Sequence, residues 1–169
     1  RDSSSTYAPK FTKDGIKTHS SEFQFDVIIY ATGFDAVTGA FNRIDIRGEN
    51  DIPLKSKWTK GPRTFLGMMV DDFPNMFMIL GPHAALGNNP RSIEHNVEWI
   101  SDFMDYMRTN NLTRAESPLS AVDEWHELVS GKAETLLGNE VDSWMTGINL
   151  NVEGKQTRTI VRYTGTAPE

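Results

Sequence analysis

The feature that most constrains the fold is a run of five apolar residues, Val27–Ala31, that ends at Thr32-Gly33. The run does not alternate with polar residues and begins with three β-branched side chains. Such a run is typical of a strand buried on both faces, as in a parallel or mixed sheet. Glycine at the end of the strand would let the backbone pass close to a ligand, because glycine has no Cβ. On these residues alone, a buried strand that ends in a glycine turn is the simpler interpretation.

Three other segments are also predicted to form strands. Ile44–Arg47 alternates between apolar and polar residues, and Thr64–Val70 and Met76–Leu80 are apolar runs separated by a turn-forming segment. Near the start, Lys13–Ile16 contains an Asp-Gly pair, which tolerates the positive φ angles of tight hairpins. The first half of the chain is therefore predicted to be rich in strands.

Two helices are predicted to follow the strands. The first has Asn88 or Asn89 as its N-cap and Pro90 at its first position, and it ends at Asn110-Asn111. Its apolar residues recur every three or four positions and define one face: Ile93, Val97, Ile100, Phe103, Met104 and Met107. The second helix is predicted to begin with Ser117 as cap and Pro118 in the first turn, with Gly131 as a potential break. It is predicted to close at Gly138-Asn139, before an irregular tail.

Composition and charge exclude several classes of protein. A formal net charge of -6 without a basic stripe argues against a nucleic-acid-binding protein. The absence of cysteine excludes disulfides, thiolate metal sites and a cysteine nucleophile. No apolar run approaches the ~20 residues that span a bilayer, and the chain does not open with an apolar leader. We therefore expect a cytoplasmic protein without a membrane or nucleic-acid partner.

Extended to Asp26–Phe41, the glycine segment resembles the Ala-Thr-Gly-Phe-Asp-Ala region of a known family. That family is the class B flavin-dependent monooxygenases of the Baeyer–Villiger type, which includes the cycloalkanone and phenylacetone monooxygenases. Three further blocks follow in the family's order: Phe73–Phe77 with Gly81-Pro82, Ser92–Ile100, and Asp142–Lys155. Four ordered blocks make a chance match improbable.

The resemblance implies an enzyme that holds FAD and NADPH in two dinucleotide-binding domains. In this family NADPH reduces the flavin, and O₂ then adds to give a flavin peroxide. The peroxide attacks a ketone carbonyl, and the product is an ester or a lactone. The expected partners are therefore a small-molecule ketone and O₂.

The resemblance also implies that the chain is the incomplete C-terminal part of such a flavoprotein. The family's two glycine-rich fingerprints, its signature motif and its arginine beside the flavin are absent, so no catalytic residue is expected in this chain. The expected fold class is α/β, with strands followed by two helices and an irregular tail. Residues 1–33 would end the NADP-binding domain, and residues 34–169 would belong to the FAD-binding domain. The missing N-terminal part of the same protein would then be a partner, and the chain alone would be inactive.

On the FAD side, the resemblance implies contacts from Gly33, Gly81, Pro82, Asn88 and Asn89. A helix that begins at these asparagines presents unpaired N–H groups and a partial positive charge, which would stabilise reduced flavin. Without the resemblance, a capped surface helix is the preferred interpretation.

On the NADP side, the resemblance implies contacts from Trp144 and Asn149, in a loop that covers the cofactor. The alternative for Trp144 is a hydrophobic anchor for the tail. Leu86, Gly87 and Asn89 would line the substrate pocket, and the small side chains at the first two positions favour a bulky or cyclic ketone. Other loops that refill the space are an equal alternative.

Two other functions remain compatible with the sequence. Another class B flavin monooxygenase would oxygenate an amine or a sulfide with the same cofactors. A non-catalytic binding fragment is the second alternative. No metal site is predicted, because the histidines lack ligands at metal spacing, and His83 is predicted to be a bystander in the flavin-facing loop.

Overall fold

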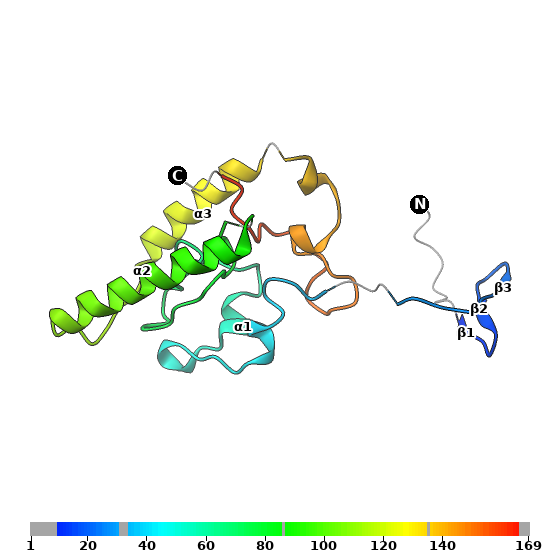
Figure 1. Cartoon of the computed structure of the whole chain (residues 1–169), viewed down its shortest axis with the longest axis horizontal. Coiled ribbons are helices and arrows are strands. Elements are labelled where there is room, and N and C mark those ends of the chain that lie inside the picture. Colours follow the sequence, from blue (N-terminus) through cyan, green and yellow to red (C-terminus); the bar gives the residue numbers. More distant parts are fainter. Residues whose placement is uncertain (1–9, 31–33, 86, 135, 166–169) are drawn as a thin grey trace. The chain divides into compact units, whose positions relative to one another are not determined.

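The computed structural model describes residues 10–30, 34–85, 87–134 and 136–165. The chain divides into two compact units, Arg1–Gly33 and Phe34–Glu169 (Figure 1). The first unit ends at Gly33 and the second begins at Phe34. Which cofactor domain each unit would belong to stays a prediction.

The first unit contains a three-stranded antiparallel sheet in the order β1-β2-β3. The strands are β1 (Lys10–Phe11), β2 (Gly15–Lys17) and β3 (Glu22–Gln24). The turn between β1 and β2 is closed by a hydrogen bond from Thr12 N to Gly15 O at 2.9 Å, which confirms the predicted hairpin. Gly15 is required here because a Cβ would collide with the carbonyl oxygen of Phe23 across the sheet.

The prediction of a buried strand at Val27–Ala31 is wrong for the residues that the structure describes. Val27–Tyr30 pairs with no strand, and the side chains of Val27 and Ile29 are 74% and 84% exposed. A strand buried on both faces needs neighbouring strands and covering layers, which the described residues of this unit do not supply. The apolar pattern of Val27–Tyr30 is typical of a buried strand, but the described part of the chain leaves these residues largely exposed.

The three later strands are also wrong as strands, and the described residues contain no parallel or mixed sheet. Ile44–Arg47 and Thr64–Val70 contribute only isolated bridges, and Met76–Leu80 contributes none. Positive φ angles at Leu66 and Gly67 turn the backbone so that Phe65 pairs with Met69, four residues later. Apolar side chains of these segments pack into a core instead: Val70 and Met78 lie in one cluster with Leu54, Trp58 and Phe73.

Both predicted helices are confirmed, and α2 (Asn89–Thr109) and α3 (Leu119–Ala133) are the long helices in Figure 1. Part of the predicted apolar face of α2 packs, through Ile100, Phe103 and Met107, against a second cluster around Met68 and Met69. The rest of that face is half-exposed: Ile93, Val97 and Met104. None of the described helices has the length and hydropathy that crossing a membrane would require.

The ends of α3 differ from the prediction. Its N-cap is Pro118, while Ser117 is buried and its hydroxyl bonds to none of the described residues. Gly131 lies inside the helix, and the helix ends at Ala133 instead of Gly138-Asn139. Short turns complete the second unit: η1 (Phe41–Arg43), η2 (Glu49–Asp51), α1 (Leu54–Lys57), η3 (Leu137–Glu140) and η4 (Trp144–Thr146).

Replacing Asn88 with alanine is expected to lower the free energy of unfolding by about 1 kcal/mol. The Asn88 side chain caps α2 by accepting a hydrogen bond from Arg91 N at 3.3 Å, and alanine leaves that N–H without its partner. Chemical denaturation measures the change. Asn88→Asp is the matched control and keeps the cap, so equal losses in both variants would contradict the capping role.

Candidate functional site

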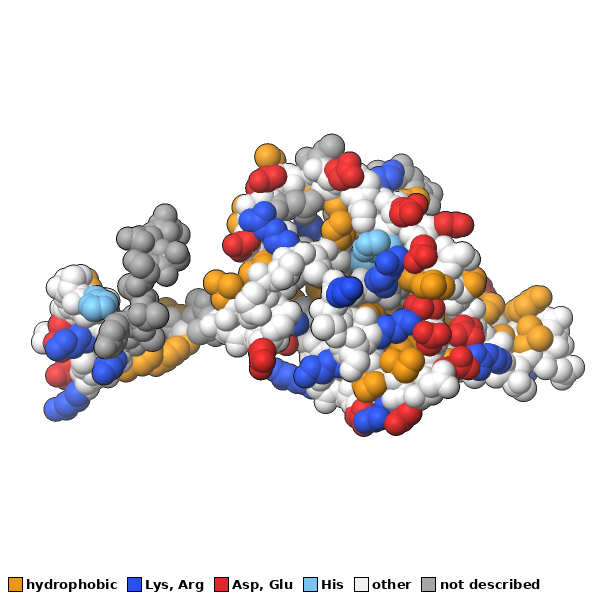
Figure 2. Space-filling view, turned by 180° about the vertical axis from the view of Figure 1, so that it is seen from behind, with side chains coloured by type: hydrophobic (Ala, Val, Ile, Leu, Met, Phe, Trp, Pro, Cys, Tyr) orange, Lys and Arg blue, Asp and Glu red, His pale blue; other side chains and the backbone are white. Residues whose placement is uncertain are grey.

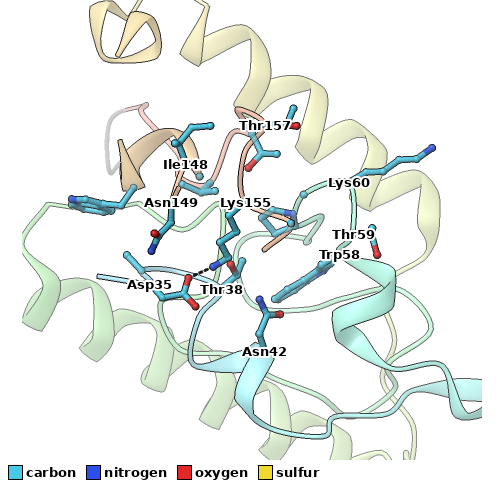
Figure 3. A pocket seen from close by; sticks show the side chains of 18 of the residues that line it. Asp35, Thr38, Asn42, Trp58, Thr59, Lys60, Ile148, Asn149, Lys155 and Thr157 are labelled. Carbon is cyan, nitrogen blue, oxygen red and sulfur yellow. Dashed lines mark hydrogen bonds and ion pairs between the residues drawn. The ribbon is translucent and has the colours of Figure 1, made fainter. Parts of the chain in front are cut away.

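A cavity of about 530 Å³ lies in the second unit, between three segments of the chain. Its walls come from Phe34–Asn42, from Lys55–Pro62, and from the tail between Trp144 and Val161. Figure 3 shows the side chains of these segments facing one another across the hollow. The two residues predicted for the NADP side, Trp144 and Asn149, both line this cavity.

Trp144 is placed by a tightly hydrogen-bonded turn, η4. The Ser143 side chain accepts a hydrogen bond from Met145 N, and Ser143 N donates to Thr146 Oγ1 at 3.1 Å. The turn ends at Gly147, whose φ of 73° favours glycine and whose missing Cβ leaves room for the hydroxyl of Thr159. Trp144 itself stays 43% exposed, so much of its ring is available for contact.

Asn149 is engaged within the chain. Its Nδ2 donates to Phe34 O at 3.3 Å, and its Oδ1 accepts a hydrogen bond from Asn151 N at 3.0 Å. Its backbone N–H donates to Lys155 O at 2.9 Å and so closes the loop from 149 to 155. The amide therefore fixes the loop, a role that the sequence does not predict for it.

An ion pair joins opposite walls of the cavity. Lys155 Nζ binds Asp35 Oδ1, and Figure 3 shows the two side chains pointing toward each other. The rim also carries Lys55, Lys60 and Arg158, so cations outnumber carboxylates in the lining. Together with the indoles of Trp58 and Trp144, this is a surface on which an anionic ligand with flat rings could bind.

His83, which the sequence analysis predicts to be a bystander, is fully buried and hydrogen-bonded within the chain. Its Nε2 lies 2.9 Å from Ile160 O and its Nδ1 lies 3.4 Å from the hydroxyl of Thr64, which donates to Pro82 O. Burial, aided by the nearby charges of His126 and Arg63, lowers the pKa of His83 from 6.5 to about 4 despite the bond to Ile160. The ring is therefore neutral near pH 7, and it ties the 81–85 loop to the tail.

The residues predicted for the FAD and substrate sides lie outside the lining of this cavity. Gly81 and Pro82 are buried, and a Cβ on Gly81 would lie 2.5 Å from Gly67 O. Asn88 and Asn89 are exposed at the start of α2. Gly87 is also exposed, and a Cβ there would meet nothing within 4 Å. Two predicted residues, Gly33 and Leu86, lie outside the described residues.

Asp35, Trp58 and Lys155 also line the cavity, and none of the three is among the predicted site residues. Asp35 is part of the Ala-Thr-Gly-Phe-Asp-Ala motif, so the motif was a usable signal for it. Lys155 ends the Asp142–Lys155 block, and local spacing does not show which way its side chain turns.

Three carboxylates come close together away from the cavity. Oxygens of Glu49, Asp72 and Glu116 lie within 4.8 Å of one another. Arg114 binds Glu49 at 2.6 Å and Glu116 at 2.5 Å, and Lys57 binds Asp72 at 2.6 Å. Acidic and basic side chains are interspersed in the same way over the face shown in Figure 2. The cluster is thus compensated by cations of the chain itself.

The known proteins that resemble this chain include several Baeyer–Villiger monooxygenases. No family model matches the chain. Cyclohexanone 1,2-monooxygenase from an Acinetobacter species is 40% identical over 157 residues, which is 92% of this chain and 28% of the relative. A Baeyer–Villiger monooxygenase from Pseudooceanicola batsensis is 40% identical over 142 residues, 83% of this chain and 26% of the relative. This chain is homologous to one part of the Baeyer–Villiger monooxygenases. It spans about 28% of the length of such a relative.

Solved Baeyer–Villiger monooxygenase structures share the fold. Cyclohexanone monooxygenase from Rhodococcus sp. Phi1 bound to NADP⁺ matches with a TM-score of 0.81 at 38% identity, over 89% of this chain and 28% of that one. The OTEMO complex with FAD and NADP matches with a TM-score of 0.79 at 36% identity, over 93% of this chain and 28% of that one. A phenazine N-monooxygenase from Lysobacter antibioticus is also related, with 33% identity over 159 residues, 94% of this chain and 29% of the relative.

Proposed function

We propose that this chain belongs to an NADPH- and FAD-dependent monooxygenase that converts a ketone to an ester or a lactone. The observation that carries the proposal is the meeting of Trp144 and Asn149 in one cavity with basic and aromatic walls. Relatives that match most of this chain include monooxygenases named for cyclohexanone, cyclopentanone and acetone, and matching structures contain NADP.

The cavity residues fit a nicotinamide dinucleotide. Trp144 would lie against a flat part of the cofactor, with the indole N–H as a donor, and Lys60 and Arg158 would face its phosphates. Bound NADPH supplies a hydride to the flavin. The chain's own contribution would be to hold the cofactor in place with the tail loop and to exclude water from it.

The flavin would be met by the loop after residue 80 and by the start of α2, whose described residues do not line the cavity. Asn88 and Asn89 would direct free N–H groups of the α2 N-terminus toward it, while Gly81 and Pro82 would shape the wall behind. In the same proposal Gly33 would also contact the flavin, residues 1–33 would end the NADP-binding domain, and residues 34–169 would belong to the FAD-binding domain. The oxygen-activating groups would come from the rest of the enzyme.

The substrate would be a bulky or cyclic ketone. Leu86, Gly87 and Asn89 would line its pocket, and the open space around Gly87 supports a roomy one. A second candidate function is oxygenation of a nitrogen atom instead of a ketone, which the similarity to the phenazine N-monooxygenase favours. Exchanging this chain for the matching segment of the Acinetobacter cyclohexanone 1,2-monooxygenase tests between them. NADPH-dependent lactone formation from cyclohexanone supports the ketone reaction, and turnover of phenazine alone would support the second candidate.

Replacing Trp144 with alanine is expected to weaken NADP⁺ binding about tenfold, because a stacked aromatic surface and one donor are lost. Calorimetry of NADP⁺ binding and thermal unfolding, both on the same preparations, check the effect. Trp144→Phe is the matched control, since it keeps a ring and should retain most of the affinity. Parallel losses of affinity and stability in the alanine variant would instead favour an anchor for the tail.

A further inference from the structure

The ion pair between Asp35 and Lys155 is largely removed from solvent. The two side chains are 19% and 14% exposed, whereas the surface pair of Asp105 and Arg108 on α2 is 70% and 78% exposed. Charges withdrawn from solvent are screened less by salt and hold each other more firmly. The pair joins residues 120 positions apart, so it connects the segment after residue 33 to the tail loop.

A second contact connects the same two segments one residue away. Asn149 Nδ2 donates to Phe34 O, next to Asp35. Within the loop, Asn149 N is bonded to Lys155 O, so the two residues that reach across the cavity are fixed to each other. The loop from 149 to 155 is thus held to the neighbouring residues 34 and 35 by two contacts, the Asn149 hydrogen bond and the Lys155 ion pair.

Gly39 makes room for this arrangement. A Cβ at position 39 would lie 2.6 Å from Cγ and 2.7 Å from Oδ2 of Asp35, and it would collide with the Asp35 carbonyl oxygen. Any larger residue at 39 must therefore displace the carboxylate that receives Lys155. The absence of a side chain at Gly39 therefore leaves the room that Asp35 needs to bind the tail.

We propose that Asp35 and Lys155 form the latch that holds the tail loop across the cavity, and that Gly39 is its positioning residue. This role for the latch rests on the proposed function, in which Trp144 and Asn149 cover NADP. The loop begins with Asn149 and follows Trp144 in the chain. With the latch closed the loop keeps a ligand in the cavity, and with it open the loop can exchange the ligand.

Hydrogen exchange of the full chain without nucleotide tests the latch directly. Asp35→Asn and Lys155→Met are each expected to speed amide exchange in residues 149–155 about tenfold, without change in α2. Asp105→Asn makes the same chemical change in an exposed pair and should leave the loop unaffected. The double variant Asp35→Lys with Lys155→Asp restores the charges in reversed order and should bring exchange back toward the original rate. Unchanged exchange in both single variants would overturn the latch.

Gly39→Ala provides a variant that alters no charge and should speed exchange in the same residues. NADP⁺ titration of the same proteins separates this proposal from the proposed function. Faster loop exchange in the variants, together with undetectable NADP⁺ binding by the whole enzyme that carries the unmodified sequence, would keep the latch and remove the cofactor role. Loop exchange in Gly39→Ala that matches the unmodified chain would remove Gly39 from the proposal.

Discussion

Replacing Lys57 with methionine is expected to lower the free energy of unfolding by about 3 kcal/mol, because the change leaves a poorly solvated carboxylate without its counter-ion. Lys57 Nζ lies 2.7 Å from Asp71 Oδ2 and 2.6 Å from Asp72 Oδ2. The Asp71 side chain is only 10% exposed, whereas that of Asp72 is 46% exposed. The loss therefore falls at the lower end of the range for buried ion pairs.

The pH range of this contribution follows from the pKa of Lys57. Burial lowers that pKa, but the hydrogen bonds to Asp71 and Asp72 outweigh burial and raise it above 10.5. A raised lysine pKa means that the stabilisation is complete below pH 10.5 and is lost only as the pH rises through the folded value. Urea denaturation at pH 7 thus measures the full effect.

Lys55→Met is the matched control for Lys57→Met, since Lys55 lies on the same short helix, α1, with an exposed side chain. The control should change stability by less than about 0.5 kcal/mol. Equal losses in the two variants would show that the methionine disturbs α1 itself and that the ion pairs contribute little.

The two long helices could be predicted from the sequence because their signals are local. Asn88 caps α2, Pro90 fits its first turn, and the apolar residues repeat at helical spacing. The limits of α3 were harder, because a serine before a proline resembles a cap in sequence. In the structure the backbone at Pro118 is extended and takes the cap position, which leaves Ser117 buried.

The strands could not be predicted correctly, because an apolar run indicates that its side chains are buried but not which segment they pack against. Val70, Phe73 and Met78 are buried as expected of core residues, but they pack around Trp58 in turns and loops. The left-handed conformations at Leu66, Gly67 and Leu80 break the extended backbone that a strand requires. Of these three residues only Gly67 favours such a conformation, whereas the positive φ angles at Asp72 and Asn75 fall in the predicted turn.

The site was predictable in part, through family resemblance and not through local chemistry. Trp144 and Asn149 were expected to act together, and they line one cavity. Their structural support comes from residues far away in sequence, as Lys155 shows by reaching Asp35. Long-range pairs of this kind depend on how the tail returns to the body of the unit, which no spacing in a single sequence encodes.

Acidification is expected to destabilise the second unit between about pH 6.5 and pH 4 through His83. The ring is fully buried, and its pKa falls from 6.5 in the unfolded chain to about 4 in the folded one. Over that interval His83 is protonated in the unfolded chain but not in the folded one, so the free energy of unfolding decreases as the pH falls. The shift corresponds to about 3 kcal/mol, and the contribution is fully present above pH 6.5.

His83→Asn isolates this effect, because asparagine tolerates the positive φ of 66° at this position and does not titrate. The variant should be less stable at pH 7, where the bond to Ile160 is lost, and its stability should depend less on pH between 6.5 and 4. His95→Asn, on the exposed face of α2, is the control and should keep the original pH dependence. Burial and Arg63 also lower the pKa of His126, so a smaller slope of the same sign should remain in His83→Asn. If the free energy of unfolding of His83→Asn depended on pH as steeply as that of the unmodified chain, the His83 ring would have the same pKa in the folded and the unfolded chain. The burial of the ring and its hydrogen bonds do not favour that outcome.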